Sequence, residues 1–256
     1  MIPAVIPPLT GLSVLVTRPA AQAAVLAANI GALGGEAVVL PAIEIVPVTA
    51  AVSGSHELVI FVSVNAVEHG ARLINRTSTM RIAAIGRATA AALAAAELTA
   101  DIVPATGFDS ETLLAHPDLN LAPGSRVLIV RGSGGREVLR ETFAGQGCSV
   151  EMLDVYQRVL PAIDATFLTD LETSWTAGGI NIVTATSVET LRNLTALLSE
   201  RGRELLKTTP LVVASHRIRQ AAMDMGLCAE CIVAAGADDQ SIIGALSQWH
   251  ARARTH

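Results

Sequence analysis

Aromatic and charged residues are scarce in this chain of 256 residues. Only 3% are aromatic and 16% are charged, whereas about 25% are charged in an average globular domain. Few aromatic rings are available to stack on bases, and a net charge of −5 without any run of Lys or Arg offers no basic surface to phosphates. The composition therefore predicts no nucleic-acid partner.

Long apolar runs are also missing, although 51% of the residues are hydrophobic. No uncharged stretch provides the ~18 consecutive apolar residues of a membrane-spanning helix. Pro3, Pro7 and Pro8 interrupt the segment in which a secretory signal would have its apolar core. The cysteine count of 3 is odd, which indicates reduced thiols rather than a disulfide framework. We expect a cytoplasmic protein with no membrane partner.

The chain alternates short Val-, Ile- and Leu-rich runs with Ala-rich amphipathic segments, which is typical of an α/β protein. Strands are expected at 12–17, 37–40, 58–63, 81–86, 101–104, 126–131, 150–156, 180–185, 210–215 and 231–234. The expected helices include 20–33, 64–74, 88–96, 136–146, 188–199 and 218–225. Most of these strands lack polar alternation, as expected for parallel strands covered by helices on both faces.

An internal repeat is the most informative feature of the sequence. Residues 13–40 align without a gap to 126–153, and both copies run strand, arginine, loop, helix, glycine, strand. Further segments repeat in the same order, so that each half supplies five of the ten expected strands. Five strands are enough for a doubly wound, flavodoxin-like sheet. The expected fold class is α/β, with two similar doubly wound parallel-sheet domains.

Two proline-bounded segments, 42–48 and 154–160, lie outside the repeat and are interpreted as paired linker strands. They occupy the same point in each half. The chain could therefore leave a first domain, build a second one and return to complete the first. Simple tandem domains fit these residues equally well.

Polar residues follow the expected strands at their C-terminal ends, where open α/β sheets bind ligands. The candidates for substrate binding are Arg18, Ser63, Asn65, Gly86, Thr89, Arg131, Ser187 and Ser215. Free N–H groups at several helix starts could together hold an anion. Ser, Thr and Asn are also natural helix N-caps, so a local role stands beside the binding role at those positions.

Motifs for cofactors and metals are incomplete. The run RGSGGRE (131–137) has Glu137 where a dinucleotide-binding loop has its last glycine, which favours a looser anion-binding turn. Cys228 and Cys231 have C-x-x-C spacing, but no second pair accompanies them, so they are interpreted as structural thiols. The histidines show no metal-binding spacing. We expect neither a cofactor nor a metal ion.

Tyr156 is the one tyrosine of the chain and lies in the second linker segment. A phenol can donate a proton or a hydrogen bond to a leaving group. The alternative is a packing residue with a satisfied hydroxyl. The residues alone do not choose between these roles.

An ordered series of short motifs over nearly the whole chain resembles the uroporphyrinogen-III synthase family. The motifs include VLVTRP (14–19), FVSVNAV (61–67), AAIGRATAAAL (83–93), the run from RVLIVRG to Tyr156, TATSVETLRNL and VVASHRIRQAA. The resemblance implies the exchanged topology. Domain 1 would comprise 1–41 and 161–256, domain 2 would comprise 49–153, and a two-stranded β-ladder of 42–48 and 154–160 would form the hinge.

The resemblance also implies an activity. Family members cyclise hydroxymethylbilane to uroporphyrinogen III, with loss of water and inversion of ring D, and use neither metal nor organic cofactor. Tyr156 would be catalytic, as a proton donor or an orienting group, and Ser63, Thr89, Ser187 and Ser215 would bind the anionic substrate. We expect a monomer. The alternative is a non-catalytic two-lobed ligand-binding or regulatory protein of the same fold.

Overall fold

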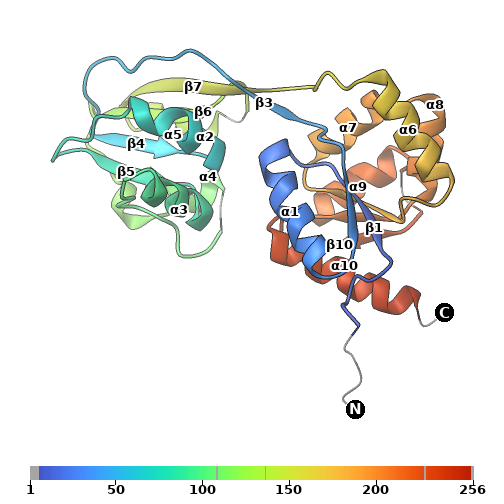
Figure 1. Cartoon of the computed structure of the whole chain (residues 1–256). Coiled ribbons are helices and arrows are strands. Elements are labelled where there is room, and N and C mark those ends of the chain that lie inside the picture. Colours follow the sequence, from blue (N-terminus) through green and yellow to red (C-terminus); the bar gives the residue numbers. More distant parts are fainter. Residues whose placement is uncertain (1–5, 108, 136, 228, 255–256) are drawn as a thin grey trace. The chain divides into compact units, whose positions relative to one another are not determined.

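The computed structural model describes residues 6–107, 109–135, 137–227 and 229–254. Contacts within the chain divide it into two units (Figure 1). Unit 1 comprises Met1–Glu44 and Leu160–His256, and unit 2 comprises Ile45–Val159. Each unit contains a five-stranded sheet. Two ends of the chain therefore build unit 1 together, whereas unit 2 is one continuous stretch.

The sheet of unit 1 has the strand order β10-β9-β8-β1-β2, and every pair of neighbours is parallel. Its strands are β1 (Ser13–Val16), β2 (Glu36–Val39), β8 (Ile182–Ala185), β9 (Leu211–Val213) and β10 (Cys231–Val233). Strand β1 pairs with β2 on one side and with β8 on the other. Numbered within this unit, the order is that of flavodoxin-like sheets.

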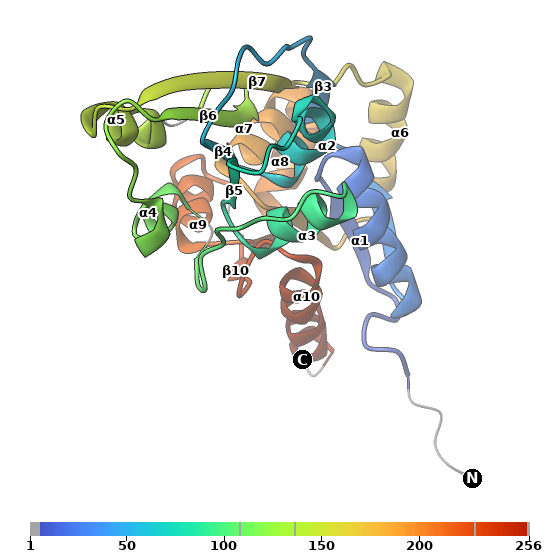
Figure 2. The ribbon, with the colours of Figure 1, turned by 90° about the vertical axis from the view of Figure 1, so that its left-hand side faces the viewer.

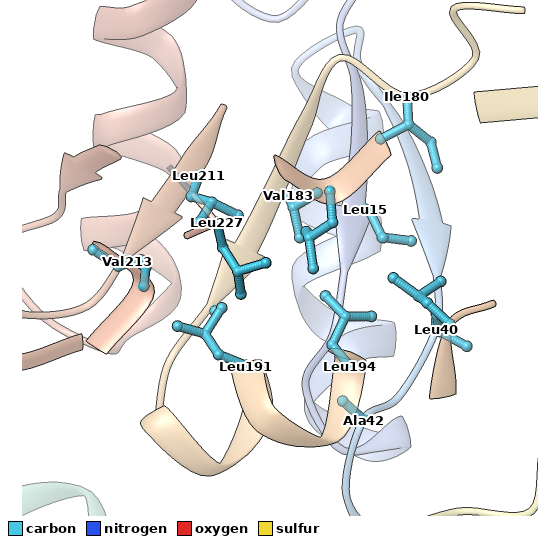
Figure 3. Close-up of a cluster of buried hydrophobic side chains, with 14 of the residues drawn as sticks. Leu15, Leu40, Ala42, Ile180, Val183, Leu191, Leu194, Leu211, Val213 and Leu227 are labelled. Atoms are coloured by element: carbon cyan, nitrogen blue, oxygen red, sulfur yellow. The ribbon is translucent and has the colours of Figure 1, made fainter. Parts of the chain in front are cut away.

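Helices cover both faces of this sheet, because successive strand residues point to opposite sides. The helices are α1 (Ala20–Ala32), α6 (Ala165–Thr176), α7 (Val188–Leu197), α8 (Glu200–Thr208), α9 (His216–Asp224) and α10 (Asp239–Ala253). Leu15 and Val183 pack with Leu191 and Leu194 of α7 in one buried cluster (Figure 3). Val14 packs in a second cluster with residues of α1 and α10. The two clusters are the hydrophobic cores of unit 1.

The sheet of unit 2 has the order β3-β7-β6-β4-β5. Its strands are β3 (Glu44–Pro47), β4 (Leu58–Phe61), β5 (Arg81–Ala84), β6 (Arg126–Gly132) and β7 (Ser149–Val159). Pairs β7·β6, β6·β4 and β4·β5 are parallel. The helices are α2 (Val64–Gly70), α3 (Arg87–Ala95), α4 (Ser110–Leu114) and α5 (Val138–Gly145), with short 3-10 turns at Ala71–Leu73 and Pro117–Leu119. The long strand β7 lies beside β6 (Figure 2).

These sheets confirm the α/β class with two doubly wound parallel sheets. The prediction of a strand at 101–104 is wrong, since this segment forms a single β-bridge, between Ala83 and Ile102. The side chain of Asp101 accepts a hydrogen bond from Ile82 N, and Pro104 has no N–H to donate, so a longer ladder cannot form. Helices α4, α6 and α8 also lie in intervals between the expected strands, and α10 follows the last of them. The expected helix start at Arg136 lies outside the described residues.

The two linker segments pair with each other, as expected. Strand β7 runs unbroken through 154–159, and Val48 N donates to the carbonyl of Val155 at 3.0 Å. β3 and β7 are therefore paired neighbours, and the ladder that they form is continuous with the sheet of unit 2. The unit boundaries fall at 44/45 and 159/160, inside the expected linker segments 42–48 and 154–160. None of the helices in the described ranges is long and apolar enough to cross a bilayer.

Candidate active site

A β-bulge between β6 and β7 sets the position of Tyr156. Arg131 pairs with Asp154, but the next residue, Gly132, pairs with Tyr156, so Val155 is skipped in the pairing with β6. Ser133 N then donates to the carbonyl of Tyr156 at 2.7 Å. Bulges redirect side chains and are frequent beside active sites. This one places the ring of Tyr156 directly against Gly132.

The contact between this ring and Gly132 leaves no room for a side chain. A Cβ built on Gly132 would lie 2.5 Å from Cζ of Tyr156, 2.6 Å from Cε2 and 3.0 Å from Cε1. Contacts below about 3 Å between carbon atoms are well inside the ~3.5–4.0 Å optimum. Gly132 is therefore required by close approach of the ring and not by its backbone conformation.

The hydroxyl of Tyr156 has two polar neighbours. Its oxygen lies 3.2 Å from Ser63 Oγ, and Nη2 of Arg158 donates to it at 3.1 Å. The centroid of the His69 ring lies 5.9 Å from that of the Tyr156 ring. Tyr156 is only 1% exposed, and a buried phenol with two partners fits the requirement that buried polar groups be hydrogen-bonded.

Ser63 begins helix α2 as its N-cap, and its Oγ accepts a hydrogen bond from Ala66 N at 3.0 Å. The sequence left a capping role and a site role side by side for this residue. The structure gives Ser63 the capping role and also places its hydroxyl beside that of Tyr156. Because the cap fixes the rotamer of Ser63, its oxygen is held in place next to the phenol.

A cavity of about 270 Å³ contains this group of residues. It is lined by Val62, Ser63, Ile129, Arg131, Gly132, Gly134, Gly135, Leu139, Met152, Tyr156 and Arg158. A larger hollow of about 630 Å³ lies between α2 and α3, but Ala and other aliphatic residues form most of its wall. Ligand sites combine an apolar wall with a few converging polar groups. The smaller cavity is the candidate site, because its polar side chains converge.

Arg131 lines the cavity, but carboxylates already hold its guanidinium. Nε donates to Asp154 at 3.0 Å, and Nη1 donates to Glu137 at 2.9 Å. Burial disfavours the charged form of Arg131, yet the hydrogen bonds to Glu137 and Asp154 outweigh burial and raise its pKa. Arg131 therefore holds the loop that precedes α5. Its positive charge is balanced by the carboxylates of Glu137 and Asp154.

Glu137 is held from two sides. Hydrogen bonds from Arg140 and then from Arg131 lower the pKa of the Glu137 carboxyl. A lowered pKa means that the pairing is fully present above the ordinary carboxyl range and is lost as the pH falls through the lower, folded-state value. The loop is thus held by ion pairs at neutral pH.

Comparisons with known proteins identify the family. The family model described as uroporphyrinogen-III synthase HemD matches residues 24–243. Uroporphyrinogen-III synthase of Salmonella typhimurium is 32% identical over 92% of this chain and 100% of its own, and that of Escherichia coli is 31% identical with the same coverage. The chain belongs to the uroporphyrinogen-III synthase family.

Solved structures show the same fold at low sequence identity. A mutant uroporphyrinogen III synthase from Thermus thermophilus has a TM-score of 0.59 at 15% identity, covering 96% of this chain and 100% of its own. Uroporphyrinogen-III synthetase from Helicobacter pylori has a TM-score of 0.60 at 13% identity, covering 91% and 97%. The doubly wound architecture of this family member is therefore shared by distant relatives.

Three other expected residues of unit 2 lie outside the lining of the cavity. Asn65 is half-buried in the first turn of α2, and Thr89 is buried in α3. Gly86 is the N-cap of α3 in an extended conformation that any residue can adopt. The structure does not place these residues with Tyr156.

Unit 1 carries the remaining three. Ser187 caps α7 by accepting from Thr190 N at 3.0 Å, and Ser215 caps α9 by accepting from Ile218 N at 3.4 Å. Arg18 is buried, and its guanidinium bonds to the Asp239 carboxylate and the Ala237 carbonyl. All three make local or structural bonds in this family member, as the capping interpretation expects for the two serines.

The described cysteines do not line this cavity. Burial raises the pKa of the Cys148 thiol, which disfavours its reactive thiolate form. Cys231 begins β10 and packs against the core, whereas Cys228 lies outside the described residues. Within the described ranges, no group of three or more His, Cys, Asp or Glu residues is arranged to hold a metal ion.

The sequence missed Arg158, although a signal for it was present. Arg158 follows Tyr156 by two residues on the same strand, and residues two apart on a strand point to the same face. A cation at that spacing from a candidate catalytic tyrosine is expected to reach it.

Proposed function

We propose that this chain is a cyclising lyase that converts hydroxymethylbilane to uroporphyrinogen III in tetrapyrrole biosynthesis. The observation that carries the proposal is the match along the whole length of relatives named uroporphyrinogen-III synthase. In the reaction implied by the family, the hydroxymethyl group of ring A loses its hydroxyl as water. Ring D attacks through its substituted carbon, and rearrangement closes the macrocycle with ring D inverted.

Tyr156 supplies the proton in this proposal. A hydroxyl group leaves as water only if it receives a proton, and a phenol is protonated at neutral pH. The hydroxyl of Tyr156 belongs to the polar group lining the 270 Å³ cavity, where Ser63 Oγ lies 3.2 Å away. Ser63 orients the phenol and, with it, lines the place where the leaving hydroxyl would sit.

The other proposed substrate-binding positions are Asn65, Gly86 and Thr89 in unit 2 and Ser187 and Ser215 in unit 1. Their support is their placement at helix starts, where backbone N–H groups favour carboxylates. Arg18 and Arg131 are proposed to hold neighbouring loops, because carboxylates of the protein already pair with their guanidinium groups. A monomeric state, a cytoplasmic location and independence of any cofactor remain predictions.

The direct test is the isomer formed from freshly prepared hydroxymethylbilane. We expect the purified protein to yield the type III isomer, because enzymatic closure must outrun the spontaneous closure that gives type I. Chromatographic separation of the two isomers is the measurement. Type I product alone, together with retained binding of the substrate, would favour the non-catalytic binding protein instead.

Tyr156→Phe tests the proton donor. The substitution keeps the ring against Gly132 and removes only the hydroxyl. General acid catalysis contributes about 10²–10⁴-fold, and we expect kcat to fall by about 10²-fold with little change in thermal stability. Steady-state kinetics and a melting curve measure the two effects. A variant with wild-type kcat would reduce Tyr156 to a packing residue.

A further inference from the structure

We propose that Arg158 is a positioning residue that determines where the hydroxyl proton of Tyr156 points. The inference rests on the proposed function, in which that proton is delivered to the substrate. Arg158 and Tyr156 lie two residues apart on β7. Nη2 of Arg158 is 3.1 Å from the phenol oxygen, and the guanidinium carbon is 5.6 Å from the centroid of the ring.

The direction follows from the chemistry of the two groups. A guanidinium has only donors, so the phenol oxygen must accept in this hydrogen bond. Between Ser63 and Tyr156, by contrast, either hydroxyl can be the donor. Tyr156 cannot donate its hydroxyl proton to Arg158. The proton therefore remains available for a hydrogen bond to Ser63 or to a ligand in the cavity. Without Arg158, the phenol can turn to other partners.

The charge of Arg158 is also better placed than that of Arg131 to stabilise negative charge on the phenol oxygen of Tyr156. Arg131 makes ion pairs with Glu137 and Asp154. Within the part of the chain that the structure describes, no carboxylate makes an ion pair with Arg158. As the phenol gives up its proton, negative charge develops on the oxygen that Arg158 contacts. Arg158 is exposed to solvent, and a cation hydrogen-bonded to that oxygen still favours the developing negative charge.

The test compares Arg158→Gln and Arg158→Lys with Arg81→Gln as a matched control. Arg81 begins β5 of the same sheet and donates to the carbonyl of Asp118, and it does not line the cavity. Hydrogen bonds to charged groups are the stronger ones, and we expect kcat of Arg158→Gln to fall about tenfold with KM little changed. Arg158→Lys keeps a cation and recovers part of the loss, and Arg81→Gln behaves as wild type.

A second readout needs no substrate. Because Tyr156 is the one tyrosine, protein made with isotope-labelled tyrosine gives a single signal for the hydroxyl-bearing ring carbon in its NMR spectrum. We expect this signal to shift in Arg158→Gln, to shift less in Arg158→Lys and to stay in place in Arg81→Gln. The signal reports hydrogen bonding at the phenol whether or not the protein is active.

The outcomes separate the two proposals. Formation of the type I isomer alone by the wild-type protein overturns the proposed function, and with it the role of Arg158 in it. If the wild type makes the type III isomer, the role of Arg158 requires both the fall in kcat and the shift of the signal. Absence of either one overturns it, as does a rise in KM with unchanged kcat, which would make Arg158 a binding residue.

Discussion

Gly132→Ala is expected to lower kcat by about 10²-fold, because the added methyl group displaces the ring of Tyr156. The new Cβ would stand 2.5 Å from Cζ, so either the ring or strand β6 has to move. Overpacking of this kind costs about 1–3 kcal/mol of stability. A displacement of about 1 Å at a reacting group can cost about 10²-fold in rate. Steady-state kinetics on the folded variant measure the effect.

Gly145→Ala is the matched control in the same unit. Gly145 is the last residue of α5, and a Cβ there meets nothing within 4 Å. Alanine favours a helix over glycine by up to about 1 kcal/mol, so this variant should be at least as stable as the wild type and fully active. Wild-type kcat in Gly132→Ala would show that the ring position has no catalytic importance.

A double variant shows whether Gly132 acts through the phenol. If the methyl group harms catalysis only by displacing the hydroxyl, Gly132→Ala should have little further effect on kcat in a Tyr156→Phe background. Neighbouring residues that share one function are non-additive in this way. Simple multiplication of the two losses would mean that Gly132 serves the site by another route, such as the conformation of the loop that follows β6.

The sequence was sufficient for elements whose signal is local. Buried strands such as β1 and β4 consist almost entirely of apolar residues. Ser63, Ser187 and Ser215 stand where a strand ends and a helix begins, so their capping roles could be expected. The repeat then indicated the number of sheets. These predictions succeeded because neighbouring residues determine strand, turn and cap without reference to distant parts of the chain.

The site itself depends on pairing between segments, which leaves little local mark. No residue near Val155 in the sequence indicates that Val155 has no pairing partner on β6. This bulge nevertheless brings the ring of Tyr156 against Gly132. In the sequence, Gly132 is only one residue of the run RGSGGRE (131–137). Asp101 likewise falls in an expected strand, although its side chain takes the place of a ladder partner by accepting from Ile82 N. Long-range register and side-chain competition for backbone groups decided both cases.

Arg18 is a substrate-binding candidate by sequence, and its contacts in the structure support a second role, as a clamp that holds the residue after β1 and its neighbours to α10. It lies just after β1, is 5% exposed, and its guanidinium pairs with Asp239, the first residue of α10. Asn29 of α1 also donates to the Asp239 carboxylate, at 3.3 Å. Removing one partner of a buried ion pair costs about 3–5 kcal/mol. Because the side chain of Asp239 is 26% exposed, water lessens the cost, and we expect Arg18→Ala to lose about 2–4 kcal/mol.

Urea unfolding followed by tryptophan fluorescence measures this loss selectively, because the chain has 2 tryptophans, Trp175 and Trp249, and both lie in unit 1. Lys207→Ala is the control, since it breaks a pair with Glu204 whose side chains are 45% and 65% exposed, and such surface pairs contribute about 0–1 kcal/mol. Asp239→Asn should destabilise like Arg18→Ala if the pair is a clamp. An unchanged urea midpoint in Arg18→Ala together with a raised KM would contradict the clamp and support a role of Arg18 in substrate binding. A clamp predicts the opposite pattern, because the folded variant keeps its cavity around Tyr156 intact in unit 2 while unit 1 unfolds more readily.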